Sequence, residues 1–423
     1  MAAPNGALRR ATAEGSGRHI ECATMSTASF LIALIAIFIA AKVFGEIAER
    51  LGQPAVLGEL IGGVAIGVSG LRLVDPHDVT IHLLSELGVI LLLFVIGLET
   101  DLKKLMQVGG SATAVAVIGV ALPLAGGFAF GELLGMSRMV SLFLGASLTA
   151  TSVGITARVL SDLGHLKDDA SQIILGAAVV DDIIGLVLLT IVGTLAEGGA
   201  LTVLGIGRIV LIAFGFVLLA IVIGSQLAPM LIRAIDRIKV ARGLLFASIV
   251  FALALAYVAQ RVGSAIIIGS FAAGLVLART HRGKDICREV HDVSQFFVPI
   301  FFVAVGAAID FRTINWMGFA LAAIGIVGKV LAGFVVWRKG MNRLVVGAGM
   351  IPRGEVGLIF AQIGLSTRLL SAELYSAVTV MIMITTFVAP PLLRRLLAQE
   401  TPGELESGSA DIVMDAPADD AGS

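Results

Sequence analysis

The chain has 423 residues, of which 57% are hydrophobic and 14% are charged, and its formal net charge is −1. Soluble globular domains carry about 25% charged residues, so this composition excludes an ordinary soluble protein. The near-neutral charge argues against a nucleic-acid partner. Cys22 and Cys287 lie far apart and indicate neither a disulfide framework nor a metal site. With no phosphate-binding GxxxxGK[ST] motif either, we expect no cofactor and no enzymatic activity.

Apolar runs long enough to cross a bilayer recur from Leu31 to about Leu397. Backbone groups in lipid must satisfy their own hydrogen bonds, so these runs predict helices and an all-α polytopic membrane protein. About thirteen transmembrane helices are expected, at residues 27–48, 55–69, 82–99, 109–133, 139–160, 171–194, 202–231, 242–260, 265–278, 292–309, 315–337, 344–365 and 373–397. The fifth and the twelfth are interrupted by polar residues, Gly or Pro.

The two ends of the chain differ in composition from the apolar part, 25–398, which we predict to be the transmembrane domain. Residues 1–24 are polar and lack periodicity, which predicts a disordered tail or a translation start assigned too early, because Met25 directly precedes the first apolar run. Residues 399–423 are acidic and rich in Gly, Ser, Pro and Ala, which predicts a disordered tail.

Lys and Arg gather in the loops on one side of the predicted helices, as in Lys103, Lys104, Arg279 and Arg282. Basic loops stay in the cytoplasm during insertion, so this side is predicted to be cytoplasmic. The N-terminus is then expected outside and the C-terminus inside, in the plasma membrane of a cell (the inner membrane where there are two).

The sequence also contains an internal repeat. Residues 49–58 (ERLGQPAVLG) align with 260–269 (QRVGSAIIIG), Gly63 falls on Gly274, and Gly97 falls on Gly306 in a second aligned segment. The third segment aligns 153–155 (VGI) with 356–358 (VGL), each in an interrupted helix. The offset of seven predicted helices is odd, which inverts the second copy in the membrane. Inverted repeats with interrupted helices predict a secondary transporter whose site lies at the bilayer midplane, where those helices cross.

Asp181, Asp182 and Lys329 lie in the middle of predicted spans, where a charge costs about 3 kcal/mol even on lenient scales. Asp181 and Asp182 lie in 171–194, and adjacent acids titrate as a coupled pair that can bind a proton or a cation. Their alternative role is structural, with backbone donors or a lysine holding them. Lys329 lies in 315–337 and needs a buried anion, for which an aspartate of 171–194 is the obvious candidate. Alternatively, its ammonium reaches the membrane interface.

The interrupted helices carry further candidate ligands. Residues 149–156 (TATSVGIT) offer four hydroxyls beside a glycine, with Thr151 and Ser152 as candidate cation ligands, unless the hydroxyls only bond carbonyls of their own helix. Residues 347–357 (GAGMIPRGEVG) include Pro352, which removes a backbone donor. Opposing helix ends that meet in the membrane suit an ion site. Arg353 and Glu355 are expected to form an ion-pair network there.

The Asp181–Asp182 pair, the TATSVGIT break, Lys329 and the IPRGEVGLI break together resemble monovalent cation/proton antiporters of the Kef- and NapA-like superfamily, from about Ser26 to Leu397. The resemblance implies a mobile core (109–194 and 315–397), a dimerisation scaffold (27–99 and 242–309), a connector (202–231) and elevator-type transport. It also implies that Asp182 binds the transported Na⁺ while Asp181 pairs with Lys329. The double aspartate is similar to the electrogenic branch, which exchanges Na⁺ or Li⁺ for a larger number of protons.

Other functions remain open from the sequence. Glutathione-gated potassium relatives usually carry Gln-Asp at the paired acids and a C-terminal nucleotide-binding domain, neither of which occurs here, yet K⁺/H⁺ exchange stays an alternative. A sodium-coupled organic anion symporter of similar fold is another alternative, and a channel or ion sensor is a third. The expected partners are Na⁺ or another monovalent cation, H⁺, membrane lipids and a second copy of the chain. Glu59, on a short predicted helix, could line a cavity or the subunit interface.

Overall fold

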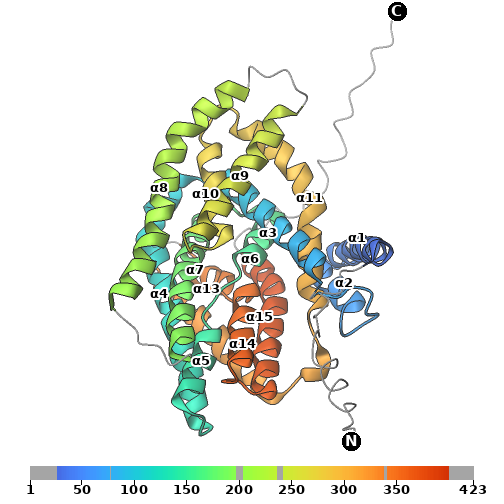
Figure 1. The fold of residues 1–423 in the computed structure, drawn as a ribbon, viewed down its shortest axis with the longest axis vertical. Helices are drawn as coiled ribbons and strands as arrows, with labels where there is room; N and C mark the ends of the chain where they lie inside the picture. Colours follow the sequence, from blue (N-terminus) through green and yellow to red (C-terminus); the bar gives the residue numbers. More distant parts are fainter. Residues whose placement is uncertain (1–25, 77, 197–202, 236–241, 338–340, 400–423) are drawn as a thin grey trace, which may run out of the picture.

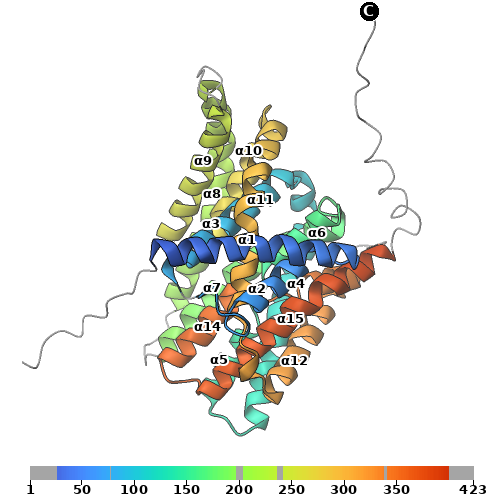
Figure 2. The same ribbon diagram turned by 90° about the vertical axis from the view of Figure 1, so that its right-hand side faces the viewer.

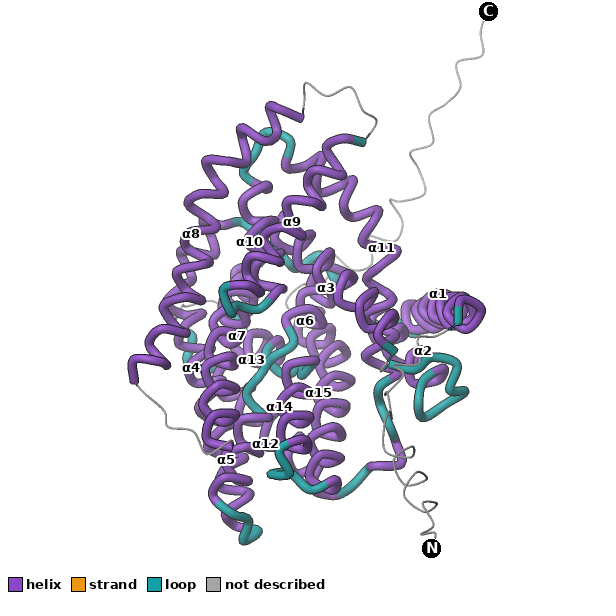
Figure 3. The backbone as a smooth tube through the Cα atoms, in the orientation of Figure 1, coloured by secondary structure: helices purple, strands orange, loops and turns teal. Residues whose placement is uncertain are grey.

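The computed structural model describes residues 26–76, 78–196, 203–235, 242–337 and 341–399. Both predicted disordered tails lie outside these residues, apart from Gln399. Regular structure in the described residues is helical, with fifteen α-helices and one 3₁₀-helix (Figures 1 and 3). The elements are α1 (Thr27–Arg50), α2 (Ala55–Ile66), α3 (Val79–Glu99), α4 (Leu102–Leu133), α5 (Arg138–Ser147), α6 (Val153–Asp162), α7 (Asp169–Ala196), α8 (Val203–Ile235), α9 (Gly243–Arg261), α10 (Ile266–Ala278), α11 (Gly283–Ala307), η1 (Phe311–Thr313), α12 (Trp316–Gly333), α13 (Arg343–Gly349), α14 (Glu355–Ser366) and α15 (Ala372–Ala398).

Each of the thirteen predicted helices has a counterpart in this set. The two interrupted helices account for the difference in number, because 139–160 divides into α5 and α6, and 344–365 divides into α13 and α14. Nine helices among the described residues are long and apolar enough to cross a membrane, while α2 and α10 are shorter apolar helices. The all-α polytopic membrane fold is therefore confirmed.

Some helix boundaries differ from those predicted from hydrophobicity. Helix α4 begins at Leu102 rather than at 109, because the carboxylate of Asp101 accepts the backbone N–H groups of Lys103 and Lys104 and caps the helix. Helix α11 begins at Gly283 rather than at 292. Both helices start with polar turns that extend beyond their apolar runs, so hydrophobicity alone places their first residues too late.

The helices pack in two groups. In one group α4 contacts α5, α7 and α12, while α15 contacts α12, α13 and α14. In the other, α3 contacts α10 and α11, α2 contacts α1 and α11, and α9 packs on α10; α8 lies against α10 and α7 and so joins the two groups. Helix α6 packs on α7 and α15 but also touches α2 and α3, so it lies at the boundary. Figures 1 and 2 show α8, α9 and α10 towards one end of the molecule and α5 towards the other.

Two close helix crossings show the inverted repeat in three dimensions. A methyl group on Gly63 of α2 would lie 2.9 Å from the Cα of Gly306 on α11. One on Gly97 of α3 would lie 3.0 Å from the Cα of Gly274 on α10. The repeat aligns Gly63 with Gly274 and Gly97 with Gly306, so each crossing joins one motif from each copy. The same glycine–glycine contact therefore forms twice, and the residue that the first repeat supplies in one crossing is supplied by the second repeat in the other.

Candidate ion-binding site

The two interrupted helices meet at their breaks. The first break lies between α5 and α6, and the second lies between α13 and α14. The backbone N–H of Ser152 donates to the carbonyl of Pro352 at 2.8 Å. The hydroxyl of Thr156 donates to the carbonyl of Gly349 at 2.6 Å. These bonds join residues about 200 positions apart and satisfy backbone groups that the broken helices leave without partners.

The hydroxyls of residues 149–156 have different roles. The hydroxyl of Thr149, just after α5, donates to the carbonyl of Ala146 in that helix at 2.8 Å and so follows the alternative in which the hydroxyls bond nearby carbonyls. The hydroxyl of Thr151 reaches across the crossing to the carbonyl of Met350 at 3.4 Å. The buried hydroxyl of Ser152 has no hydrogen-bond partner among the described residues. Ser152 thus leaves one buried oxygen available at the crossing.

A buried ion pair lies beside this crossing. The ammonium Nζ of Lys329, on α12, lies 3.2 Å and 3.4 Å from the two carboxylate oxygens of Asp181 on α7. Both side chains are fully buried. The ion pair predicted from the sequence is therefore present, and Lys329 does not extend to the protein surface. Removing one partner of such a pair leaves an uncompensated charge in the interior.

Asp182 faces a different environment from its neighbour. Successive residues of a helix point about 100° apart, which separates the two carboxylates. Asp182 is 7% exposed and lines a cavity of about 10 Å³, the size of a single water molecule. Apolar side chains of α3 and α10, among them Leu93, Ile267 and Phe271, form the opposite wall. An ion at Asp182 would therefore be almost dehydrated.

Arg353 lies fully buried in the break between α13 and α14. Its guanidinium Nη1 donates to the carbonyls of Met350 at 3.2 Å and Ile351 at 3.1 Å, which ties the end of α13 to the break. Its own carbonyl accepts the hydroxyl of Thr386 on α15 at 2.6 Å, a contact that no sequence pattern indicated. The side chain of Glu355 lies outside the described part of the structure, so the ion-pair network between Arg353 and Glu355 stays a prediction.

The family profile described as "Sodium/hydrogen exchanger, transmembrane" matches residues 30–399. The chain belongs to this exchanger family. The high-affinity Na⁺/H⁺ antiporter NhaS3 of Synechocystis is 42% identical over 419 aligned positions, which cover 88% of this chain and 91% of NhaS3. The Na⁺/H⁺-K⁺ antiporter GerN of Bacillus cereus is 37% identical over 377 positions, covering 86% of this chain and 95% of GerN. Membership of the cation/proton antiporter superfamily, predicted from the motifs, is confirmed.

A solved structure shares the fold of this exchanger. The sodium proton antiporter MjNhaP1 from Methanocaldococcus jannaschii superposes with a TM-score of 0.64 at 18% sequence identity. The match covers 88% of this chain and 97% of MjNhaP1. The likeness therefore extends over nearly the whole helical assembly and not over one bundle of helices.

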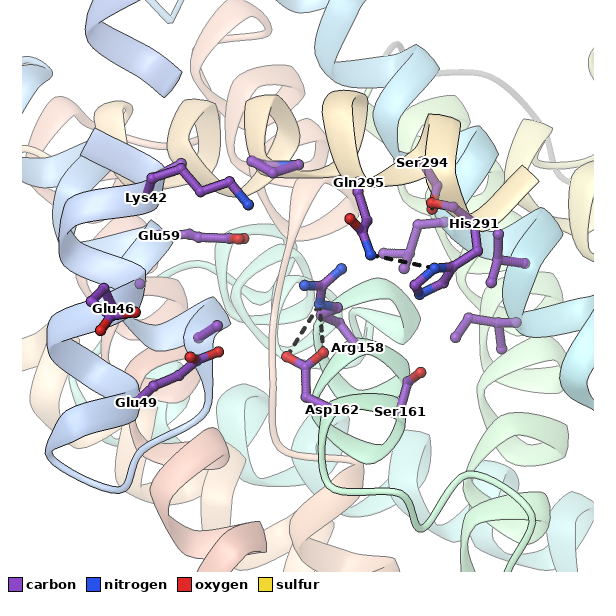
Figure 4. Close-up of a pocket in the computed structure, with 17 residues that line it drawn as sticks. Lys42, Glu46, Glu49, Glu59, Arg158, Ser161, Asp162, His291, Ser294 and Gln295 are labelled. Carbon is purple, nitrogen blue, oxygen red and sulfur yellow. Dashed lines mark hydrogen bonds and ion pairs between the residues drawn. The ribbon is translucent and has the colours of Figure 1, made fainter. Parts of the chain in front are cut away.

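A second, larger cavity of about 350 Å³ opens between α1, α2, α3, α6 and α11 of the exchanger (Figure 4), and we refer to it as the vestibule. Its charged lining residues are Lys42, Glu46, Glu49, Glu59, Arg158 and Asp162, with His291 beside them. The guanidinium of Arg158 lies 2.9 Å from a carboxylate oxygen of Asp162, four residues further along α6. That spacing is typical of a helical ion pair. Glu59 lines this cavity, which is one of the two roles that the sequence left open for it.

Proposed function

We propose that this chain exchanges Na⁺ for H⁺ across the membrane as a secondary active transporter, with Asp182 as the carboxylate that binds the ion. The observation that carries the proposal is the charge arrangement on α7 and α12. Lys329 engages Asp181 in a fully buried pair, while the adjacent Asp182 lines a cavity the size of one water. The sodium/proton antiporters among the relatives support the choice of ions.

Exchange follows from competition for Asp182. A small, nearly dry cavity holds either a proton on the carboxylate or a dehydrated cation next to it, because protonation removes the negative charge that attracts the cation. A bound Na⁺ also weakens the attraction between the neighbouring Asp181 and Lys329, which lets Lys329 release its proton. More protons than sodium ions then move in each cycle, so the exchange is electrogenic.

The two packing groups suit an elevator-type movement. The group of α4–α7 and α12–α15 carries the site and is the proposed mobile core. The group of α1–α3 and α9–α11 is the proposed scaffold and dimer interface, with α8 as the connector. The apolar wall of α3 and α10 opposite Asp182 acts as a barrier, because moving an uncompensated charge past it is costly. Only a core loaded with an ion or a proton would pass, which limits leakage.

The proposed orientation places the basic loops in the cytoplasm of the cell and the N-terminus outside, in a plasma membrane whose lipids surround the chain. Contacts between these loops support their placement on the same side of the membrane. The ammonium of Lys104 donates to the carbonyl of Lys167 at 3.1 Å. The guanidinium of Arg394, near the end of α15, lies against Gly52 at the end of α1. The positive-inside rule then assigns that side to the cytoplasm.

The competing functions make different demands on the site. An organic anion does not fit a cavity of about 10 Å³ at Asp182, which disfavours the symporter. A channel requires a fixed pore, and saturable counterflow would exclude it. K⁺ exchange is supported by relatives that transport K⁺, GerN among them, and is decided by measuring the ion preference directly.

The test is proton movement in proteoliposomes driven by gradients of Na⁺, Li⁺ or K⁺. Asp182→Asn should abolish Na⁺-driven proton movement, because the amide neither binds a proton nor attracts a cation. Asp168→Asn is the matched control, since Asp168 is a half-exposed aspartate that contacts His165 just before α7. Substantial exchange by Asp182→Asn would overturn the assignment.

A further inference from the structure

Glu59 is an acid inside the scaffold group that the exchange mechanism does not use. It lies on α2 among apolar residues and is 5% exposed. Figure 4 shows its carboxylate pointing into the vestibule. The oxygen Oε2 has no hydrogen-bond partner among the described residues. A buried carboxylate oxygen aimed into a polar cavity therefore lacks a protein group to bind.

Among the described residues, no cation forms an ion pair with Glu59. Lys42 and Arg158 line the same cavity, and the guanidinium of Arg158 bonds Asp162 on its own helix. The vestibule is lined by four carboxylates and two fixed cations, namely Glu46, Glu49, Glu59 and Asp162 against Lys42 and Arg158. Arg50 balances Glu46 from outside the lining, so the cavity carries an excess of one negative charge when Glu59 is ionised and then attracts cations from its open side.

A buried carboxylate without a partner is unfavourable in its charged form. Two states relieve this cost: the carboxyl binds a proton, or a cation binds beside it. The vestibule, at about 350 Å³, accommodates a cation together with several of its waters, unlike the cavity at Asp182. The two cavities also share a wall, because Leu92 and Ile96 of α3 line the vestibule while Leu93 lines the cavity of Asp182.

We propose that Glu59 forms a second ion site, at which H⁺ and a partly hydrated monovalent cation compete before the ion reaches Asp182. The role of this site in transport rests on the proposed function of the chain as an Na⁺/H⁺ antiporter. Glu59 belongs to the scaffold group and Asp182 to the core group, so a movement of the core separates the two sites. An ion then loads through Glu59 from the vestibule side alone, and transport from the opposite side bypasses it.

Sidedness gives the first test. Glu59→Gln should raise the KM for Na⁺ about tenfold when Na⁺ is supplied from the vestibule side, the scale of one lost charged contact. The KM from the opposite side and the maximal rate should stay unchanged, as measured in vesicles of both orientations. Glu46→Gln is the matched control, because Glu46 lines the same cavity but is half-exposed and bonded to Arg50 at 2.8 Å. It should change neither KM by more than about twofold.

Equal KM values for Glu59→Gln and the unaltered chain would overturn the proposal. An equal rise from both sides would overturn it as well, since that is the result of a general structural defect. If Glu59→Gln does not fold, Glu59→Asp replaces it, because the shorter acid keeps the charge but withdraws the oxygen from the cavity. It should raise the KM on the vestibule side alone, and an unchanged value there would again overturn the site.

Binding without transport gives the second test. Purified Asp182→Asn should still be stabilised against heat by Na⁺ relative to choline, and adding Glu59→Gln should remove that stabilisation. No stabilisation of Asp182→Asn by Na⁺ would overturn the proposal. The outcome is separable from the proposed function: loss of exchange in the unaltered chain refutes Na⁺/H⁺ antiport, whereas the Asp182→Asn measurement reports on Glu59 alone.

Discussion

The pair formed by Asp181 and Lys329 should show strong energetic coupling in a double-mutant cycle. The perturbations are Asp181→Asn, Lys329→Met and the two together. The ammonium lies 3.2 Å from one carboxylate oxygen, and both side chains are fully buried. Each single change strands one buried charge, so we expect each to lower the free energy of unfolding by about 3–5 kcal/mol. The double variant contains neither charge and should be less destabilised than either single variant.

The assay is unfolding in detergent micelles at neutral pH, followed by intrinsic fluorescence, for the four proteins of the cycle. The pair formed by Arg50 and Glu46 serves as the control, because its atoms lie closer, at 2.8 Å, but its side chains are 77% and 56% exposed. Its coupling energy should not exceed about 1 kcal/mol. If the losses of Asp181→Asn and Lys329→Met simply add in the double variant, burial does not set the strength of the pair and the reasoning fails.

Three further outcomes follow from the crossings and the charges. Gly306→Ala forces a methyl group into the backbone carbonyl oxygen of Leu60, beside the facing Gly63 of α2, and should lower the stability against thermal unfolding by about 1–3 kcal/mol. Gly109→Ala has nothing within 4 Å of the added methyl group and should be neutral or slightly stabilising. Thr156→Val leaves the carbonyl of Gly349 without its 2.6 Å donor and should cost about 1–3 kcal/mol; an unchanged unfolding midpoint would contradict this. Lys329→Ala should be inactive or exchange ions electroneutrally under voltage clamp, and unchanged electrogenicity would refute Lys329 as a proton carrier.

The ion pair and the broken helices were predictable because each follows from a local conflict with the membrane. Lys329 and the acids of α7 are charges in apolar runs, and such charges require each other. Pro352 and its glycines cannot continue a regular helix, so the break was visible before the structure. The bilayer restricts where charges and helix breaks can occur so strongly that short stretches of sequence suffice to predict them.

The details that the sequence left open depend on how distant helices pack. Thr149 and Thr156 look equivalent in the run 149–156, yet one bonds its own helix and the other bonds a carbonyl of α13. The register of the crossing decides between them, and that register is a tertiary property. The vestibule also depends on tertiary packing. Glu59 and Arg158 lie about 100 positions apart in the sequence and come together because α2 packs against α6.

The paired glycine crossings also constrain how the chain is made. Helices are inserted in the order of synthesis, but α2 finds its close partner Gly306 only when α11 has been translated, and α3 waits for Gly274 on α10. The glycine-bearing faces of α2 and α3 therefore remain unpaired in the bilayer while more than half of the protein has still to be synthesised. Packing between such helices depends on close backbone approach rather than on expulsion of water, so lipid substitutes poorly for the missing partner. Chains truncated before α10 should be recognised as incomplete and degraded, and separately expressed halves should persist only when both are present.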